Sequence, residues 1–215
     1  MFEPWIGDNY SEPEKLIGGK RVLVVGESHY SAEHEVGSTV PDMTLFTMNN
    51  YRSIRKDNRP LSPGKREAWT RTLDNVAWAV SGKGPQELAN QGKRGEFDIW
   101  NQLGFYNYIP VVLANAPQTK RPDRELFSAG KVPFEQVIEK HKPQILIVCG
   151  FQLFPWLIRN HYPDYKDDPW TFGGDWIDIP REGPIRAVRM KHPAIGFSHK
   201  KWHQVIRRAT SSELG

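Results

Sequence analysis

Short apolar runs alternate with helical patterns along most of this chain. Apolar runs that predict core strands occur at 22–25, 105–113 and 144–149, and an alternation of polar and apolar residues at 185–190 predicts a half-buried strand. Apolar residues recur at helical spacing between them and after the last one, at 64–80, 97–103, 133–141, 153–158 and 198–209. Strands interleaved with helices form a mainly parallel sheet covered on both faces. We therefore predict an α/β fold, a three-layer α/β/α sandwich with a mainly parallel central sheet of about four strands.

The segments between these elements are predicted to be irregular. Residues 1–20 hold prolines and paired glycines and indicate an irregular lead-in to the first strand. Residues 31–63 show little periodicity and form a predicted long loop, which we expect to be functional because such loops are uncommon inside compact domains. Polar, turn-rich segments follow at 81–95 and 115–126, and a short edge strand is predicted at 176–179. A length of 215 residues fits a single domain over 1–215.

Composition places the chain among soluble proteins. Its residues are 38% hydrophobic, no apolar run approaches the length of a membrane span, and no secretion signal opens the chain. We therefore expect a cytoplasmic protein without a membrane partner. The single cysteine, Cys149, cannot supply a disulfide or a cysteine-based metal cluster, and we expect no metal and no organic cofactor. A net charge of +4 permits a polyanionic partner without requiring one.

Chemically active side chains follow the first predicted strand. Its apolar run stops at Gly26, and Glu27, Ser28, His29 and Tyr30 come next. In open α/β sheets the ligand binds outside the carboxyl ends of the strands. These side chains are therefore expected to lie at a binding site.

Two later segments carry polar groups in comparable places. Asn107 stands inside the run FYNYIPVVL, where an amide needs hydrogen-bond partners, and the last strand runs into MKHPAIGFS. Taken in order on this architecture, VVGESHY, YNYIP and MKHPAIGFS resemble the motifs of the uracil-DNA glycosylase superfamily. The likeness covers the chain from about residue 21 to residue 208 as an order of elements.

The resemblance implies roles for the matching residues. In that family a first motif, GQDPY or GEAPG, supplies a carboxylate that orients or activates water, and a later HP motif supplies a histidine and a minor-groove wedge. Glu27 falls on the acidic position of GEAPG, and Tyr30 falls on the tyrosine of GQDPY. His192 and Pro193 match the HP pair. Asn107 is similar in context to the middle-strand asparagine that reads the base edge.

DNA glycosylase chemistry needs these groups. As the bond between base and sugar breaks, positive charge grows on the sugar and negative charge on the base, which a carboxylate and a hydrogen-bond donor stabilise. Glu27 and His192 are the expected catalytic residues. The expected substrate-binding residues are Gly26, Ser28, His29, Tyr30, Asn107 and Phe46, the last as the ring that stacks on the extruded base. The expected DNA-binding residues are Pro193, Ile195, Phe197, Ser198, Lys200 and Lys201, with Ile195 or Phe197 as the wedge.

Departures from the family pattern concern the substrate. The four cysteines of the iron–sulphur branch are missing, which excludes that cluster. Ser28 and His29 replace the aspartate and the proline of GQDPY, which predicts a more polar pocket mouth. We therefore expect a monomeric enzyme that removes uracil or, in preference, a modified base such as a hypermodified cytosine of viral DNA. It would leave an abasic site and serve DNA repair or phage defence.

Other interpretations fit part of the sequence. Glu27 could cap a turn, His192 could be a loop residue, and the aromatic side chains could belong to the core. The letters GES also resemble the GDS motif of SGNH esterases, with Ser28 as nucleophile, but Arg189 stands where those enzymes have an aspartate. A non-catalytic DNA-binding module of the same fold is a further alternative.

Overall fold

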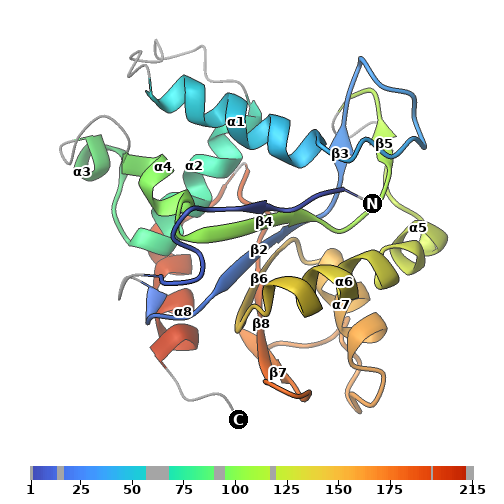
Figure 1. The fold of residues 1–215 in the computed structure, drawn as a ribbon. Coiled ribbons are helices and arrows are strands. Elements are labelled where there is room, and N and C mark those ends of the chain that lie inside the picture. Colours follow the sequence, from blue (N-terminus) through green and yellow to red (C-terminus); the bar gives the residue numbers. More distant parts are fainter. Residues whose placement is uncertain are drawn as a thin grey trace.

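A six-stranded mixed sheet forms the centre of the protein. The computed structural model describes residues 2–13, 17–56, 68–89, 95–116, 120–194 and 196–211. The sheet order is β1-β4-β2-β6-β8-β7 (Figure 1). Four strands run parallel: β2 (Val22–Gly26), β4 (Leu103–Asn107), β6 (Ile145–Cys149) and β8 (Ile185–Met190). The two edge strands, β1 (Trp5–Ile6) and β7 (Trp176–Ile179), are antiparallel to their neighbours.

Helices cover both faces of the sheet (Figure 1). One side carries α1 (Met43–Lys56), α2 (Ala68–Ser81), α4 (Gly95–Trp100) and α8 (His199–Ser211), with the short α3 (Pro85–Ala89) beside α4. The other carries α5 (Arg124–Ala129), α6 (Lys131–His141) and α7 (Leu153–His161). Alternate strand residues feed two cores, since Val24 packs on the first side and Val25 on the second. The predicted α/β class and mainly parallel sheet are confirmed.

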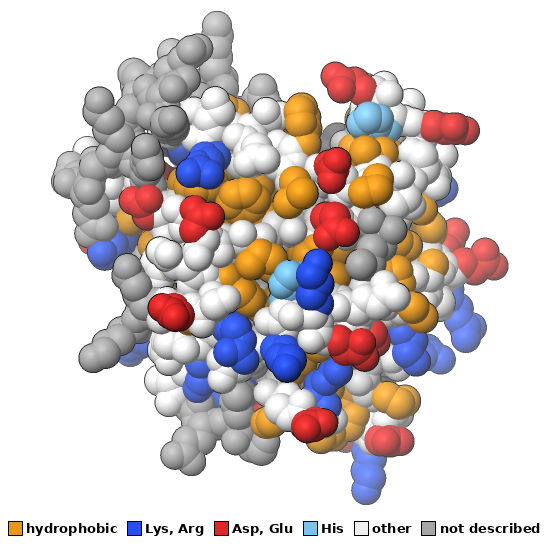
Figure 2. Space-filling model, in the orientation of Figure 1, with side chains coloured by type: hydrophobic (Ala, Val, Ile, Leu, Met, Phe, Trp, Pro, Cys, Tyr) orange, Lys and Arg blue, Asp and Glu red, His pale blue; other side chains and the backbone are white. Residues whose placement is uncertain are grey.

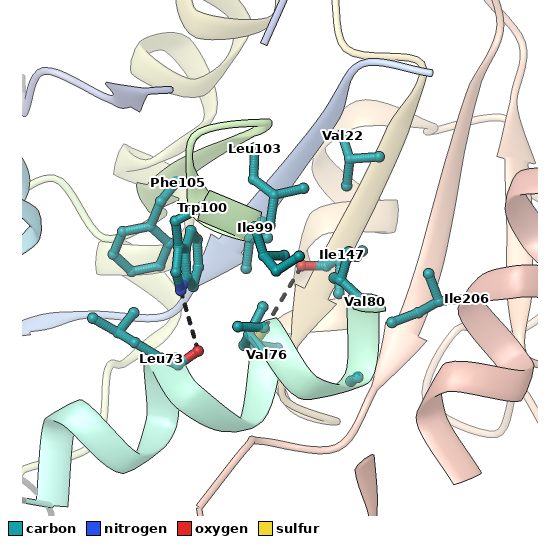
Figure 3. Close-up of a cluster of buried hydrophobic side chains, with 14 of the residues drawn as sticks. Val22, Leu73, Val76, Val80, Ile99, Trp100, Leu103, Phe105, Ile147 and Ile206 are labelled. Carbon is teal, nitrogen blue, oxygen red and sulfur yellow. Dashed lines mark hydrogen bonds between the residues drawn. The ribbon is translucent and has the colours of Figure 1, made fainter. Parts of the chain in front are cut away.

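Trp100 joins three elements in the first core (Figure 3). Its side chain is fully buried, and its indole N–H donates to the Leu73 carbonyl of α2 at 3.2 Å. The ring packs edge-on against Phe105 of β4, with centroids 5.7 Å apart.

None of the described helices is long and apolar enough to cross a membrane.

The sheet has more strands than predicted. The lead-in at 1–20 is not irregular throughout, because β1 pairs with β4 and places Trp5 opposite Phe105. Two residues are too few to produce a periodic pattern. The edge strand predicted at 176–179 is confirmed as β7. The run 105–113 is not one strand: β4 ends at Asn107, and β5 (Val112–Ala114) pairs with β3 (His29–Tyr30) in a separate two-stranded sheet.

The prediction of a loop at 31–63 is wrong for the residues that form α1. This helix occupies 43–56, and residues 57–63 lie outside the described part of the chain. Its inward face includes Thr44, Met48, Tyr51 and Arg55, which follow each other at helical spacing. This face begins with a threonine and ends with an arginine. The run of apolar residues at helical spacing is therefore too short to predict the helix.

Helices differ from the prediction in three further segments. The segment 115–126 was predicted as a loop, yet α5 begins after Asp123, whose carboxylate accepts a hydrogen bond from the Leu126 N–H at 2.9 Å. The segment 81–95 contains α3. The helix predicted at 97–103 ends at Trp100, and Gly104 belongs to β4, where it lies close to Leu23.

The strand order creates a switch point between β2 and β6. From β2 the chain continues to β4 on one side, and from β6 it continues to β8 on the other side. Such opposed connections open a crevice at the carboxyl ends of the two adjacent strands, where α/β sheets bind ligands. Glu27 follows β2 at this point, and Gly150 follows β6.

Candidate active site

The carboxyl edge of the sheet brings the three motif segments together. Gly26, the last residue of β2, is paired in register with Asn107, the last residue of β4. Glu27 follows at once, and its carbonyl accepts a hydrogen bond from the Ile109 N–H at 2.9 Å. His192 lies two residues beyond the end of β8. Glu27, Asn107 and His192 therefore leave the same edge of one sheet.

Arg121 affects the charge states of both predicted catalytic residues, Glu27 and His192. Its Nη1 lies 3.8 Å from Glu27 Oε1, and its own side chain is 68% exposed. Burial raises the pKa of Glu27, and the charge of Arg121 opposes that rise. His192 is exposed, but the protein around its ring displaces part of its water and lowers its pKa, and the charge of Arg121 lowers it further. One cation thus favours an ionised Glu27 and a neutral His192. Arg121 lies in the turn-rich segment 115–126, whose residue pattern does not indicate this ion pair.

Asn107 approaches Gly26 too closely for any larger residue at that position. A Cβ on Gly26 would lie 2.0 Å from Asn107 Oδ1, a distance no side chain tolerates. The amide is 7% exposed. Its Nδ2 lies 3.2 Å and 3.3 Å from the two ring nitrogens of His29. The amide is therefore held between the end of a strand and an imidazole.

His29 supports the site from inside the protein. Its ring is 5% exposed, its Nε2 lies 2.9 Å from Thr44 Oγ1 of α1, and it packs edge-on against Phe2. Burial lowers the pKa of His29 from its ordinary 6.5 to about 3, so the imidazole is neutral at physiological pH. The sequence predicts a polar pocket mouth formed by Ser28 and His29. His29 does not contribute to this mouth, because its ring is buried and faces α1.

Ser28 and Tyr30 are partly buried near Glu27. Burial first and the Glu27 carboxylate second raise the pKa of Tyr30, which stays a neutral phenol. Tyr30 pairs with Ala114 in the two-stranded sheet. The GESHY motif therefore spans from the end of one sheet to the start of another.

The loop after β8 is fixed by α2. The buried Asn75 donates from Nδ2 to the Pro193 carbonyl at 3.0 Å. Lys191 Nζ donates to the Gly196 carbonyl at 3.1 Å and closes the loop from the other end. Pro193 itself is buried, and Ile195 lies outside the described residues.

The remaining predicted contacts differ in exposure. Phe46 lies on α1 with 64% of its surface exposed, so it is not a core residue. Phe197 is partly buried and stacks on a tryptophan of α8. Ser198, expected to bind DNA, caps the start of α8, because its hydroxyl accepts a hydrogen bond from the Lys201 N–H at 3.4 Å. Lys200 and Lys201 are exposed in the first turn.

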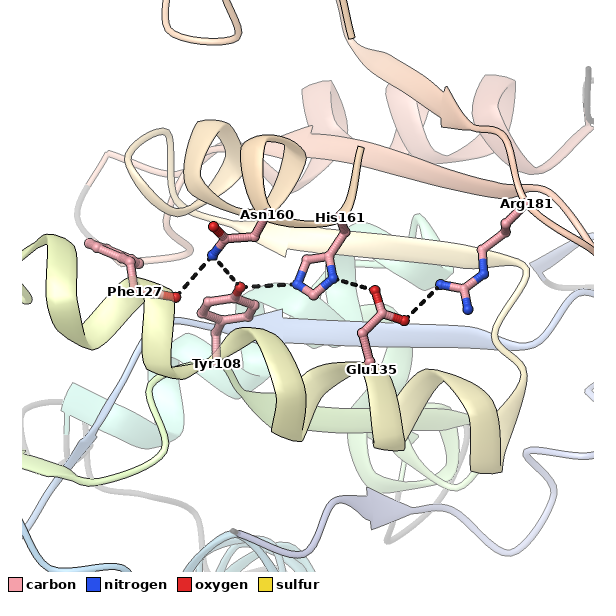
Figure 4. Close-up of polar contacts among 6 residues, drawn as sticks. All are labelled: Tyr108, Phe127, Glu135, Asn160, His161 and Arg181. Carbon is pink, nitrogen blue, oxygen red and sulfur yellow. Dashed lines mark hydrogen bonds and ion pairs between the residues drawn. The ribbon is translucent and has the colours of Figure 1, made fainter. Parts of the chain in front are cut away.

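A polar network anchors the residue after Asn107 from the other side of the sheet (Figure 4). The Tyr108 hydroxyl accepts from Asn160 Nδ2 at 2.8 Å and lies 3.0 Å from His161 Nε2. His161 Nδ1 is 2.5 Å from Glu135 Oε1, and Arg181 donates to the second oxygen at 3.1 Å. The hydrogen bond with His161 and the pairing with Arg181 lower the pKa of Glu135 to about 2. This network ties the end of β4 to α6 and α7.

Comparison with known proteins assigns no family. No protein-family model matches the chain, and no curated protein matches it either.

What the site can do follows from its groups: a partly buried carboxylate, a neutral imidazole, an amide and an exposed guanidinium. Together they can orient water, donate to a leaving group and bind an anion. Within the described residues, no group of three or more His, Cys, Asp or Glu side chains could hold a metal ion.

The neutral state of His29 makes a testable contribution to stability. The unfolded ring takes up a proton near pH 6.5, whereas the folded ring does so only near pH 3, so stability falls as the pH falls between these values. Between pH 7 and pH 5 the parent should lose about 2 kcal/mol more unfolding free energy than a His29→Gln variant. Urea unfolding at both pH values measures this difference. Equal losses in the two proteins would show that the ring is not held neutral.

The contact between Gly26 and Asn107 can be tested by a double-mutant cycle. Gly26→Ala should destabilise the protein by about 1–3 kcal/mol, because the methyl group overlaps the amide. Adding Asn107→Ala should relieve part of this cost, with a coupling of about 0.5–3 kcal/mol in denaturant unfolding. Gly173→Ala is the matched control, because a Cβ there meets nothing within 4 Å. Additive effects of the two site substitutions would contradict the contact.

Proposed function

We propose that this protein is a monofunctional DNA glycosylase that hydrolyses the N-glycosidic bond of an extruded uracil or modified base. The observation that carries the proposal is the convergence of Glu27, Asn107 and His192 at one sheet edge, beside the switch point. The resemblance of VVGESHY, YNYIP and MKHPAIGFS to glycosylase motifs supplies the reaction class. The α/β fold with a mainly parallel sheet agrees with that family's architecture.

In this reaction water replaces the base at C1′ of the sugar. The bond between C1′ and the base nitrogen breaks, and its electron pair goes to the base. Glu27 stabilises the positive charge on the sugar and orients the water, whose oxygen bonds to C1′ and whose proton passes to the carboxylate. His192 donates a hydrogen bond to the negative charge on the base. Its lowered pKa suits a neutral donor.

Recognition of the base falls to Asn107 and Phe46. An amide carries the donor and acceptor groups that read the edge of a base, and contact of the Asn107 Nδ2 with His29 holds this amide in one orientation. The exposed ring of Phe46 on α1 offers an apolar face for stacking. The same helix carries Thr44, which holds His29 behind the amide. Recognition and support are therefore connected through α1.

Surface charge supports DNA as the partner. Lys191 precedes His192 directly, and Lys200 and Lys201 lie in the first turn of α8, eight and nine residues after it. On the face drawn in Figure 2, Lys and Arg side chains gather near the centre and below it, beside exposed hydrophobic side chains. Cations next to apolar surface suit a ligand that has both phosphates and bases.

A hollow beside β5 supports the preference for a modified base. It has a volume of about 410 Å³, and its lining includes Val36, Leu113, Ala114 and Lys120. Ala114 pairs with Tyr30 of the GESHY motif, and Lys120 precedes Arg121. The hollow offers a place for a bulky substituent that uracil lacks.

Base excision is tested with labelled DNA duplexes that carry uracil, common lesions or hypermodified cytosines. Alkali cleaves the strand wherever the protein has left an abasic site. Glu27→Gln should reduce the excision rate by about 10²–10⁴-fold, because the variant loses the charge that stabilises the sugar cation. Glu139→Gln, at an exposed position of α6, is the control and should act like the parent.

Equal excision by the Glu27→Gln variant and the parent would exclude the catalytic role. Equal rates on uracil and on every modified base would remove the substrate preference while leaving the reaction class intact. Absence of abasic sites on all substrates would favour the esterase or the binding module instead.

The charge of Arg121 should be visible in the pH profile of the excision rate. Arg121 lowers the pKa of Glu27, so Arg121→Gln should move the acid limb of kcat/KM to higher pH. Arg121→Lys keeps the charge and should leave the limb near its original place. The imidazole resonances of His192, followed by NMR, should titrate at higher pH in Arg121→Gln, since the same charge lowers its pKa. Identical acid limbs in the parent and both variants would contradict this role.

A further inference from the structure

Phe151 lies at the carboxyl edge of the sheet outside the site described above. It follows Gly150 directly after β6. Gly150 has a φ of 137°, in the region that favours glycine, and its N–H donates to the Met190 carbonyl at the end of β8 at 2.8 Å. The turn is thus tied to the neighbouring strand. Phe151 nevertheless leaves 47% of its surface exposed.

One cation and one aromatic ring contact Phe151. The guanidinium carbon of Arg189 lies 4.7 Å from its ring centroid, and Trp202 packs edge-on at 6.3 Å. Trp202 also stacks on Phe197, and Lys201 Nζ lies 5.6 Å from the Trp202 centroid. We call Phe151, Arg189, Phe197, Lys201 and Trp202 the aromatic ledge. Its members fix the orientation of an exposed ring among positive charges.

Strand register places the aromatic ledge beside the candidate active site. β2 and β6 are adjacent, with Val25 opposite Val148. Continued by two residues, this register sets Glu27 level with Gly150. On the other side of β6, Cys149 is opposite Met190, two residues before His192. Phe151 therefore projects from the turn between the segments that carry Glu27 and His192.

We propose that Phe151 is a stacking platform for an unpaired DNA base next to the excised one. The inference rests on the proposed function for its ligand and adds the substrate class, single-stranded or locally opened DNA. An aromatic ring accepts any base, since every base has a π face, and the nearby cations meet the phosphates. In an intact duplex the base faces are already stacked on their neighbours. An exposed ring with the Arg189 guanidinium beside it and Lys201 on the adjoining tryptophan suits an open strand.

Binding to defined DNA probes tests the platform without requiring catalysis. Fluorescence anisotropy of the full-length protein would compare a labelled oligothymidylate of about 12 nucleotides with a fully paired duplex of the same length. Phe151→Leu keeps apolar packing but removes the planar ring, and it should weaken oligothymidylate binding roughly 5- to 150-fold. Phe151→Trp should retain the affinity. Duplex affinity should change by less than about twofold.

Trp170→Leu is the matched control. Trp170 is also an exposed aromatic residue with an arginine beside it, Arg159 at 5.7 Å, but it belongs to the pocket at the far end of α7. This variant should bind oligothymidylate as the parent does. If Phe151→Leu also binds as the parent does, or if the parent binds no oligothymidylate, the platform is overturned.

The binding and excision experiments separate the two proposals. Loss of oligothymidylate affinity in Phe151→Leu, with no abasic sites formed by the parent on any DNA, would keep the platform and reject the glycosylase. Equal excision from single-stranded DNA by the parent and Phe151→Leu, with equal affinities, would keep the glycosylase and reject the platform.

Discussion

The close approach of β2 and β4 at their carboxyl ends is the constraint on which the site depends. Gly26 lies opposite Asn107, and the space a Cβ would need is filled by the amide. Because the main chain after Asn107 continues along the end of β2, the Ile109 N–H also fixes the Glu27 carbonyl. A carboxylate and an amide from distant parts of the chain are thus set at a defined separation by backbone pairing. Rigid strand ends position functional groups better than loops do.

Electrostatics at this edge divide the titratable groups by environment. Burial alone would push Glu27 toward its neutral form, and a cation on an exposed loop opposes that tendency. Partial desolvation of the exposed His192 and the same cation lower the pKa of that ring and favour its neutral form. His29 needs no partner charge, because burial alone keeps its ring neutral. The cation thus favours an ionised carboxylate, while both imidazoles are favoured as neutral rings.

The sequence indicated the parts of the fold whose signal is local. Two of the parallel strands, β2 and β6, were predicted from continuous apolar runs, and β8 was predicted from its alternation of polar and apolar residues. The helix α1 was missed because its inward face includes Thr44 and Arg55, whose partners come from other elements. Arg121 was missed for a related reason. Its importance lies in proximity to Glu27, and a turn-rich loop gives no sign of where it will fold back.

Hydrogen bonds from both helical layers hold the site. Asn75 of α2 fixes the loop that carries His192 from one side, and Asn160 of α7 fixes Tyr108, next to Asn107, from the other. A shift of one helical layer would move either the His192 loop or the Asn107 segment, but not both. The sheet between the two layers therefore keeps the distance between these segments constant. Arg121 is the contrasting case, because an exposed ion pair is worth only about 0–1 kcal/mol. In the proposed reaction its guanidinium can therefore exchange Glu27 for a DNA phosphate at small cost, while the groups on the strands stay in place.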